Sequence, residues 1–584
     1  MAQTQPFGFA CKGGLDVNRS DFALQQEAGT AVKLENFEVD SDGGYRRING
    51  FAPLAVSGDS AGRIKTTQAI DGGSGAGAAP DNTIYTDKIL GIEGYMGGGV
   101  VCSGTNIFFT QNGADAIRIN RSSVASDGDS FSAFQDRDIA ARTNQGQVDF
   151  TTYEGAVKNN QLIICDGVNN PLLFHTESTA INTALGSITK YHSKTIAPST
   201  NPTLFNPKFA VSHKRALVFG GFSSQVAEPT GDDAARAKSL TANTIRVSAI
   251  TDITDIEGGS TFILEDKVVG LRSFRDDLII FCSNSIHRLV NMTDATNAAI
   301  VPITKNIGCI SQHSIQEIGG DLVFLSPDGL RTLAGTEKIG DTELGSISRP
   351  IYQLLVSQLI NKANTMIVSS TVLRTKNQYR LFFTLSSGEE PNVSRGIIGT
   401  ITKEGWAWST TVGIQATAIA TLIGGTGLEQ AYHGDKNGSI YEHDVGTKFV
   451  YAGVNGDIQA TYTTPTLDFG DIGTQKTLSY LNLQVETEGP VQPKVRVFVG
   501  EENGQAVQPS EDTLPTIFPP TEFGVATFSG NSGAHGFGAF ESTISRLPLR
   551  GSGNNFKFRV QTKDQNPCYS IQGMYVNYYP SGRR

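Results

Sequence analysis

Short apolar runs separated by polar turns recur along this chain, and one stretch repeats them in register. Residues 277–281 align with residues 321–325 at an offset of 44 residues, and the same register sets Leu271 over Ile315. Apolar runs of four or five residues are typical of strands buried on both faces. A period near 40–50 residues built from short strands is the signature of a β-propeller. Residues 268–333 therefore predict two neighbouring blades of a propeller.

Further units of the same kind, each an apolar strand followed by a tight turn, predict the rest of the propeller. They begin at residues 106–109, 161–164, 216–219, 379–383 and 431–432. Gly, Asn and Asp in the turns supply the positive φ that tight hairpins need. Together these units predict about seven blade-like units over residues 91–455, preceded by a glycine-rich loop or linker at residues 57–90.

A different pattern follows the propeller. Residues 479–485 and 494–499 alternate strictly between apolar and polar side chains, which indicates strands with one buried face. Residues 456–584 therefore predict a separate β-sandwich-like domain. Residues 505–545 interrupt this domain with a long irregular insertion rich in Gly, Pro and Phe, and insertions of this length are usually functional or disordered.

One helix is predicted within the propeller. Ser348 is expected to cap its N-terminus, and Pro350 lies in its first turn. Its apolar face consists of Ile351, Leu354, Leu355 and Leu359. This face predicts a helix that packs between blades.

Composition agrees with an all-β chain and narrows its partners. The chain has 584 residues, of which 65 are Gly, 22 are Pro and 18% are charged, a mixture that favours turn-rich sheets over helices. The net charge is −10 and no basic cluster occurs, which argues against a protein that grips DNA through its phosphates. An acidic surface still permits a channel that repels DNA and lets it slide.

Cysteine usage and apolar run lengths indicate where the chain folds. Six scattered cysteines without a Cys-x-x-Cys pair predict small buried side chains in a protein made in a reducing cytoplasm. The polar N-terminus does not predict a signal peptide, and no apolar run predicts a membrane span.

The chain carries no recognised catalytic motif. It has no His-Glu-x-x-His zinc motif, no phosphate-binding loop and no Gly-x-Ser-x-Gly elbow. His213, His287 and His433 stand singly on predicted strands or turns, where a structural role is favoured over metal ligation. Acidic turns at residues 40–43 and 435–444 lack a complete calcium ligand set and are predicted to be hairpin turns. We expect no enzyme activity, no metal and no cofactor.

Two weaker signals bear on carbohydrate binding. Trp406 and Trp408 could stack on a sugar, although alternating aromatic residues on a blade strand are more often core and edge residues. Residues 326–332 share part of the Asp-box of sialidase propellers, but the glycine is out of register and no paired carboxylates accompany it.

The N-terminal residues 1–56 hold the most distinctive pattern. They predict a strand, a tight Asp-Gly-Gly turn and a return strand with two arginines, a hairpin that would close or flank the propeller ring. The residues that define the pattern are Gly13, Gly14, Gly43, Gly44, Tyr45, Arg46, Arg47, Gly50 and Phe51.

This N-terminal pattern resembles the opening of the tail nozzle (tail tube terminal) proteins of short-tailed bacteriophages. The match covers roughly the first 50 residues, and the order of elements matches more loosely over the whole chain. The resemblance implies a structural virion protein that is made in the host cytoplasm and forms the end of a short tail. It also implies that the nine residues above are signature or interface positions. It also implies a tip or inter-subunit loop within the insertion, with Phe518, Pro519, Pro520 and Phe537 as candidates.

The resemblance further implies partners. They are other copies of the chain in a homo-hexameric ring, a tail adaptor ring protein, tail fibres or a plug, and phage DNA that passes through the lumen without sequence-specific binding. Two alternatives stay open. One is a carbohydrate-binding or depolymerising tail spike, and the other is a cellular propeller scaffold, which would usually have cleaner repeats.

Overall fold

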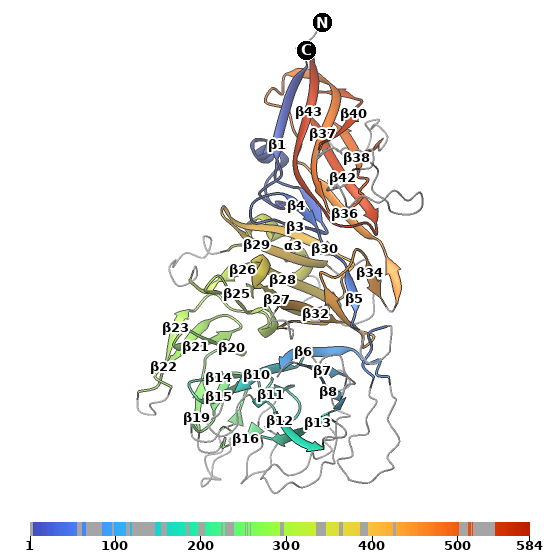
Figure 1. Cartoon of the computed structure of the whole chain (residues 1–584). Coiled ribbons are helices and arrows are strands. Elements are labelled where there is room, and N and C mark those ends of the chain that lie inside the picture. The colour runs from blue at the N-terminus through green and yellow to red at the C-terminus, as the bar shows by residue number, and fades with distance from the viewer. Residues whose placement is uncertain are drawn as a thin grey trace.

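The structure is a computed structural model. It describes residues 4–54, 61–65, 84–95, 98–104, 106–111, 117–118, 147–153, 161–182, 186–196, 205–222, 226–227, 239–250, 253, 255–256, 259–292, 297–334, 346–360, 366–385, 395–423, 428–451, 453–500, 512–514, 517 and 544–583. The chain is all-β, with a β-propeller at one end and a β-sandwich at the other (Figure 1). The two chain ends lie together at the far end of the sandwich.

The first four blades are four-stranded antiparallel sheets in the described residues. Blade one is β6 (Ile89–Tyr95), β7 (Gly98–Ser103), β8 (Asn106–Gln111) and β9 (Ile117–Arg118). Blade two is β10 (Asp149–Tyr153), β11 (Gln161–Cys165), β12 (Leu172–Asn182) and β13 (Gly186–Thr195). Blade three is β14 (Phe209–His213), β15 (Ala216–Gly220), β18 (Thr244–Val247) and β19 (Ser260–Ile263), beside a separate pair formed by β16 (Val226–Ala227) and β17 (Ser239–Leu240). Blade four is β20 (Val268–Phe274), β21 (Asp277–Cys282), β22 (Ile286–Val290) and β23 (Ala299–Thr304).

Three more sheets complete the ring. Blade five is β24 (Gln316–Ile318), β25 (Asp321–Ser326) and β26 (Gly329–Thr332), preceded by the 3-10 turn η3 (Gln312–Ser314). Blade six is β27 (Met366–Leu373), β28 (Gln378–Leu385), β29 (Arg395–Thr402) and β30 (Gly405–Val412), with the 3-10 turn η5 (Arg374–Lys376) between β27 and β28. Blade seven is β31 (Ala418–Ile423), β32 (Glu429–Gly434), β33 (Ile440–His443) and β5 (Phe51–Pro53), extended by β34 (Phe449–Tyr451) and β35 (Val454–Gly456).

The innermost strands pack around one axis. β6 contacts β31, β31 contacts β27, and β10, β14 and β20 follow one another on the other side. The amide of Val148 donates to the carbonyl of Leu90, which joins blades one and two. The seven blade-like units expected from the sequence are therefore present, although the predicted linker boundary at residue 90 falls inside β6.

The repeat in register corresponds to blades four and five. β21 and β25 occupy equivalent places, as do β22 and β26, so the offset of 44 residues is that between two adjacent blades. Blades four and five differ at their inner strands. Where blade four has β20, blade five has η3 and the short β24, and the side chain of Gln312 accepts a hydrogen bond from the amide of Leu271.

The sandwich combines both ends of the chain. One sheet consists of β3 (Phe37–Val39), β4 (Tyr45–Arg47), β43 (Tyr569–Arg583), β37 (Thr474–Thr487) and β40 (Ile544–Pro548), with β1 (Gln5–Ala10) on β43 and β41 (Ser552–Gly553) on β37. The other consists of β2 (Lys33–Glu35), β36 (Ile458–Thr463), β42 (Phe556–Asp564), β38 (Lys494–Val499) and β39 (Asp512–Thr513). Residues 1–56 and 456–584, predicted as separate units, contribute strands to both of these sheets.

The second sheet is continuous with the propeller. β2 pairs in parallel with β30 and antiparallel with β36, so blade six and the sandwich form one nine-stranded sheet. One hydrophobic core follows this sheet from Leu381 and Ile397 in blade six to Val560 in the sandwich, where it also includes Ile571 of the facing sheet. Propeller and sandwich therefore share a core as well as backbone hydrogen bonds.

Helices are short in the described residues. α1 (Asp21–Leu24) and η1 (Gln25–Glu27) lie in the N-terminal segment, and η4 (Arg349–Ile351) leads into α3 (Tyr352–Ile360). Leu355 packs into the shared core as expected, but Ser348 does not cap the helix. Its hydroxyl accepts the amide of Leu330 instead, because the residue faces blade five. No helix of these residues is long and apolar enough to cross a membrane.

Candidate functional site

The first signature glycines lie where the N-terminal segment crosses blade six. The amide of Leu15 donates to the carbonyl of Trp408 at 2.7 Å, and the amide of Ala31 donates to the carbonyl of Gly14 at 2.8 Å. Gly13 and Gly14 have φ of +91° and +70°. A Cβ at Gly14 would lie 2.7 Å from the amide nitrogen of Trp408, so this backbone approach requires glycine.

The turn between β3 and β4 holds the next signature residues. Gly43 and Gly44 have φ of +103° and +101°, as the tight Asp-Gly-Gly turn predicts. Tyr45 follows them with its side chain fully buried, and its hydroxyl donates to the carbonyl of Gly29, with the carbonyl of Lys12 also in reach. Burial raises the pKa of Tyr45 well above its usual value, so the hydroxyl stays a donor.

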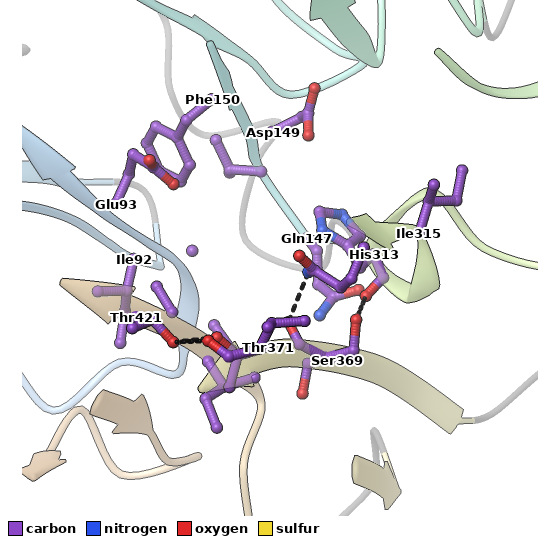
Figure 2. A pocket seen from close by; sticks show the side chains of 18 of the residues that line it. Ile92, Glu93, Gln147, Asp149, Phe150, His313, Ile315, Ser369, Thr371 and Thr421 are labelled. Carbon is purple, nitrogen blue, oxygen red and sulfur yellow. Dashed lines mark hydrogen bonds between the residues drawn. The ribbon is translucent and has the colours of Figure 1, made fainter. Parts of the chain in front are cut away.

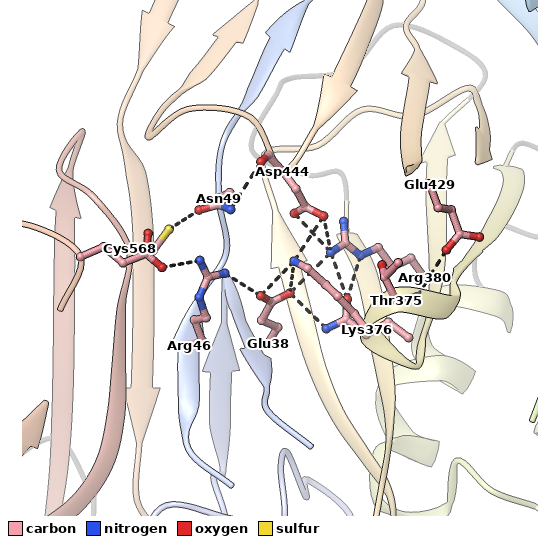
Figure 3. A network of polar contacts seen from close by, with 11 residues as sticks. Glu38, Arg46, Asn49, Thr375, Lys376, Arg380, Glu429, Asp444 and Cys568 are labelled. Carbon is pink, nitrogen blue, oxygen red and sulfur yellow. Dashed lines mark hydrogen bonds and ion pairs between the residues drawn. The ribbon is translucent and has the colours of Figure 1, made fainter. Parts of the chain in front are cut away.

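Arg46 belongs to a network of charges between the hairpin and the propeller (Figure 3). The buried carboxylate of Glu38 accepts from Arg46 at 2.9 Å, from Lys376 at 3.1 Å and from Arg380 at 3.5 Å. Asp444 accepts from Arg380 at 3.0 Å and pairs with Lys376 at 3.3 Å. The network therefore joins β3 and β4 of the sandwich to blades six and seven.

Electrostatics keep both carboxylates of this network charged. Burial alone would raise the pKa of Glu38, but Lys376 and Arg380 outweigh it and hold that pKa below its usual value. The pKa of Asp444 is likewise lowered, since Arg380 and Lys376 outweigh its burial. A cavity of about 470 Å³ borders the network, and Arg46 and Lys376 line it, both engaged with carboxylates.

Arg47 makes a second, buried connection. Its side chain is fully buried, and it donates to a carboxylate oxygen of Asp564 at 2.6 Å and to the carbonyl of the same residue at 3.0 Å. It also reaches the carbonyl of Thr447 at 3.3 Å. Arg47 therefore ties the hairpin to the end of β42 and to the segment before β34.

Gly50 and Phe51 close the ring. A Cβ at Gly50 would lie 2.0 Å from the carbonyl oxygen of Lys448, so the chain can pass there only with glycine. Phe51, on β5, stacks on Phe449 with ring centroids 4.7 Å apart and lies 5.1 Å from His433. Most of the signature residues thus join the N-terminal segment to the propeller or to the rest of the sandwich, whereas Gly13 and Gly43 shape turns within that segment. Phe518, Pro519, Pro520 and Phe537 lie outside the described residues.

A second candidate site lies on the propeller axis (Figure 2). It is a polar cavity of about 420 Å³, to which the inner elements of several blades contribute side chains. Glu93 comes from β6, Asp149 from β10, Arg272 from β20 and His313 from η3. On another wall the hydroxyls of Thr371 and Thr421 hydrogen-bond to each other.

Burial shifts the titration of these groups. It raises the pKa of Glu93 to about 7, with the nearby charge of Asp149 adding to the shift. It also raises the pKa of Asp149 to about 6, although Arg272 acts in the opposite direction. Burial, with Lys208 and Arg272 nearby, lowers the pKa of His313 to about 3, so this ring is neutral.

This cavity could not be predicted from the sequence. Its only local signal is a charged residue inside an otherwise apolar inner strand, as Glu93 is in β6 and Arg272 in β20. A single charged residue in a strand does not reveal that strands from distant blades meet around it.

The structure also shows the surroundings of the histidines that were considered as catalytic or metal-binding residues. Ser285 donates to Asp266 at 2.8 Å and contacts the Nε2 of His287 at 2.9 Å, so the serine lies between the acid and the base. A nucleophilic triad needs the histidine in that middle position. His213 contacts the hydroxyl of Ser273. Among the described residues, no three His, Cys, Asp or Glu side chains gather as a metal site.

The remaining candidates belong to turns and to the core. Residues 40–43 form the β3–β4 turn, and Asp435 accepts the amides of Asn437 and Ser439 in the β32–β33 hairpin, as expected for hairpin turns. Trp408 is fully buried in the core, and the partly buried Trp406 stacks against it. All six cysteines are buried.

Comparisons with known proteins identify no family for the chain. No protein-family model and no curated protein sequence matches the chain. Similar solved structures include the CNH domain of AfRom2, with 10% identity and a TM-score of 0.31 over 61% of this chain and 96% of that one. BBS1N in complex with ARL6DN has 10% identity and a TM-score of 0.32 over 65% of this chain and 97% of that one. A Trypanosoma rangeli sialidase has 10% identity and a TM-score of 0.28 over 88% and 95%.

Proposed function

We propose that the chain is a structural subunit of a short phage tail, forming a nozzle ring around the DNA exit channel that retains the genome and then releases it. The observation that carries the proposal is where the resemblance lies. The residues that resemble nozzle proteins, Arg46, Arg47 and Phe51 among them, are those that fasten the sandwich to the propeller and close its ring.

A tail subunit must hold its parts in a fixed relation under load. The nine-stranded sheet and the shared core join blade six to the sandwich, so a force on one is passed to the other through backbone hydrogen bonds. The Glu38 network adds charge-assisted contacts at the same junction. These features suit a rigid assembly component.

The proposed assembly is a homo-hexamer that contacts an adaptor ring and tail fibres or a plug. Because the net charge of each chain is −10, its lumen is expected to be largely negative and to let DNA slide without sequence-specific contacts. A lumen lined mainly by Lys and Arg in a reconstructed ring would contradict this part of the proposal.

Antibody-gold electron microscopy on purified virus particles tests the proposal directly. Label at the distal end of a short tail is the expected result, with an antibody to the capsid as the control for particle integrity. Label on lateral appendages would favour the carbohydrate-binding spike instead, and particles without label would contradict a virion protein. The Trp406–Trp408 pair does not favour the spike, since Trp408 is buried in the core and Trp406 stacks on it.

A further inference from the structure

The axial cavity of the propeller holds charges of both signs that do not pair. Among the described residues, the carboxylate of Glu93 has no hydrogen-bond or ion-pair partner, and that of Asp149 accepts the amide of Ala210 only at 3.3 Å, beside a contact to the Gln312 side chain. The guanidinium of Arg272 reaches only the carbonyls of Leu271 and Ile315, both at 3.4 Å. Neither carboxylate lies within 4.0 Å of Arg272, although all three line one cavity.

Unpaired charges in a partly buried cavity cost free energy, and the pKa values of the two carboxylates reflect that cost. Burial raises the pKa of both carboxylates, which means that the folded protein disfavours their charged forms. The other charged or titratable groups that line the cavity are Arg272, His313 and the exposed Glu317 and Arg374, and the exposed Lys208 lies nearby. They do not restore the usual pKa values of the two carboxylates. A ligand that brings an ammonium group to the carboxylates would offset this cost.

The remaining walls fit a small organic ligand. A volume of about 420 Å³ lies within the range of small-molecule sites. The ring of Phe150 packs over Gly91, two residues before Glu93, where it can face a cationic group. Glu317 and Arg374, which also line the cavity, are exposed, so it opens to solvent on their side.

We propose that this cavity binds a small zwitterion, whose ammonium group is received by Glu93 and Asp149 and whose carboxylate is received by Arg272. The two carboxylates and the guanidinium of Arg272 face one cavity without contacting each other. A molecule that carries both a positive and a negative charge can therefore contact both kinds of group. A plain cation would leave Arg272 unpaired, and a plain anion would leave the two carboxylates unpaired. The proposal is independent of the nozzle function.

Titration calorimetry with the full chain tests it. The probes are glycine, γ-aminobutyrate and ε-aminocaproate, in which the two charges lie progressively further apart. The matched controls are butylamine and butyrate, which carry one charge each on a similar chain. We expect at least one zwitterion to bind about tenfold or more tightly than either control, since each charge-assisted contact is worth that much. Equal binding of butylamine, or no binding of any zwitterion at millimolar concentration, would overturn the proposal.

Variants assign the contacts. Glu93→Gln and Asp149→Asn should each weaken the zwitterion about tenfold, and Arg272→Gln should remove its advantage over butylamine. Glu317→Gln is the matched control, because it alters an exposed carboxylate of the same cavity. Thermal unfolding without ligand distinguishes a binding role of Glu93 from a structural one. Because Glu93→Gln removes an unpaired charge, it should leave the melting temperature unchanged or raise it. Zwitterion binding unaffected by all three variants would also overturn the proposal.

The affinity should depend on pH in a stated direction. The ammonium group contacts the ionised carboxylate, and Glu93, with a pKa of about 7, is mostly protonated at pH 6 and mostly ionised at pH 8. Binding of the best zwitterion should therefore strengthen about tenfold over that interval and level off above it. An affinity that falls as the pH rises would contradict the assignment of Glu93.

Discussion

At the scale of single residues, Asn36 shows how much the junction depends on one side chain. It is 2% exposed, and its amide donates to the carbonyls of Val412 and Gln459 at 3.1 and 2.9 Å. Its side-chain oxygen accepts the amide of Val412 at 2.9 Å, and its backbone has φ of +56°. Asn tolerates this conformation better than most residues, so the backbone and the side chain favour the same residue.

Replacing Asn36 should therefore be costly. Asn36→Ala removes three hydrogen bonds and leaves partly buried backbone groups of blade six and β36 unpaired, which should lower the free energy of unfolding by about 2–4 kcal/mol. Urea denaturation measures this loss. Asn455→Ala, at an exposed position of β35, is the control and should change stability little. Equal effects of the two substitutions would contradict the role given to Asn36.

The signature glycines make a matched pair. Gly14 and Gly43 both have positive φ, so alanine strains both, by about 1–2 kcal/mol. At Gly14 the new Cβ would also collide with the backbone of Trp408, whereas at Gly43 the nearest atom is 4.0 Å away. Gly14→Ala should thus lower the melting temperature clearly more than Gly43→Ala. A similar decrease in both variants would show that only the backbone conformation matters.

At the scale of elements, the closure of blade seven contains an unusual pair of histidines. His433 is fully buried, neither of its ring nitrogens has a partner among the described residues, and its ring centroid lies 4.6 Å from that of His443. Burial lowers the pKa of both, that of His443 to about 3. Phe51 of β5 covers the pair, so the strand that closes the ring rests on two neutral imidazoles.

This pair should make the closure sensitive to acid. In the folded protein the pKa of His443 lies below its value of about 6.5 in the unfolded chain. The fold therefore keeps its full stability above about pH 6.5 and loses stability as the pH falls from about 6.5 towards 3. For His443 alone the loss between pH 7 and pH 5 is about 2 kcal/mol. Urea denaturation at both pH values measures it.

A substitution identifies the group responsible. His433→Phe keeps the ring and removes two unpaired nitrogens, so it should raise stability at neutral pH and reduce the loss on acidification. A His433→Phe protein with the full loss between pH 7 and pH 5 would assign the acid sensitivity elsewhere.

The positions of many strands could be predicted from the sequence, because apolar runs and apolar–polar alternation are local patterns. β21 and β25 follow from their apolar runs, and β38 matches the alternating residues 494–499. Pairing over long separations could not be predicted. β1 pairs with β43 through Gln5 and Tyr578, and nothing in either strand specifies the other. The convergence of Glu93 and Asp149 on the axis was missed for the same reason, since it depends on the order of blades.

At the scale of the whole molecule, the nine-stranded sheet makes blade six and the sandwich one structural unit. The shared core includes residues of β28, β29, β36 and β42. Strands that share a core and a ladder of hydrogen bonds are expected to open together.

Native-state hydrogen exchange tests this unit. Amides of β28 and β42 should exchange with the same opening free energy and the same denaturant dependence. The strands β14 and β15 of blade three, which belong to another core, are the reference and need not follow them. If the amides of β42 stayed protected after β28 had opened, blade six and the sandwich would be separate units that meet at β2.

The closure by β5 also sets the order of events during synthesis. Pro53 pairs with Tyr441, a residue made 388 positions later, and Gln5 pairs with Tyr578. At about 5–20 residues per second, the nascent β5 waits roughly 20–80 s for its partner strand. Until then β5 has no β33 to pair with, and a ribosome that stalls before residue 441 leaves a ring that cannot close. Unpaired strand edges favour association between chains, so a slow or truncated translation should yield aggregates rather than a smaller folded propeller.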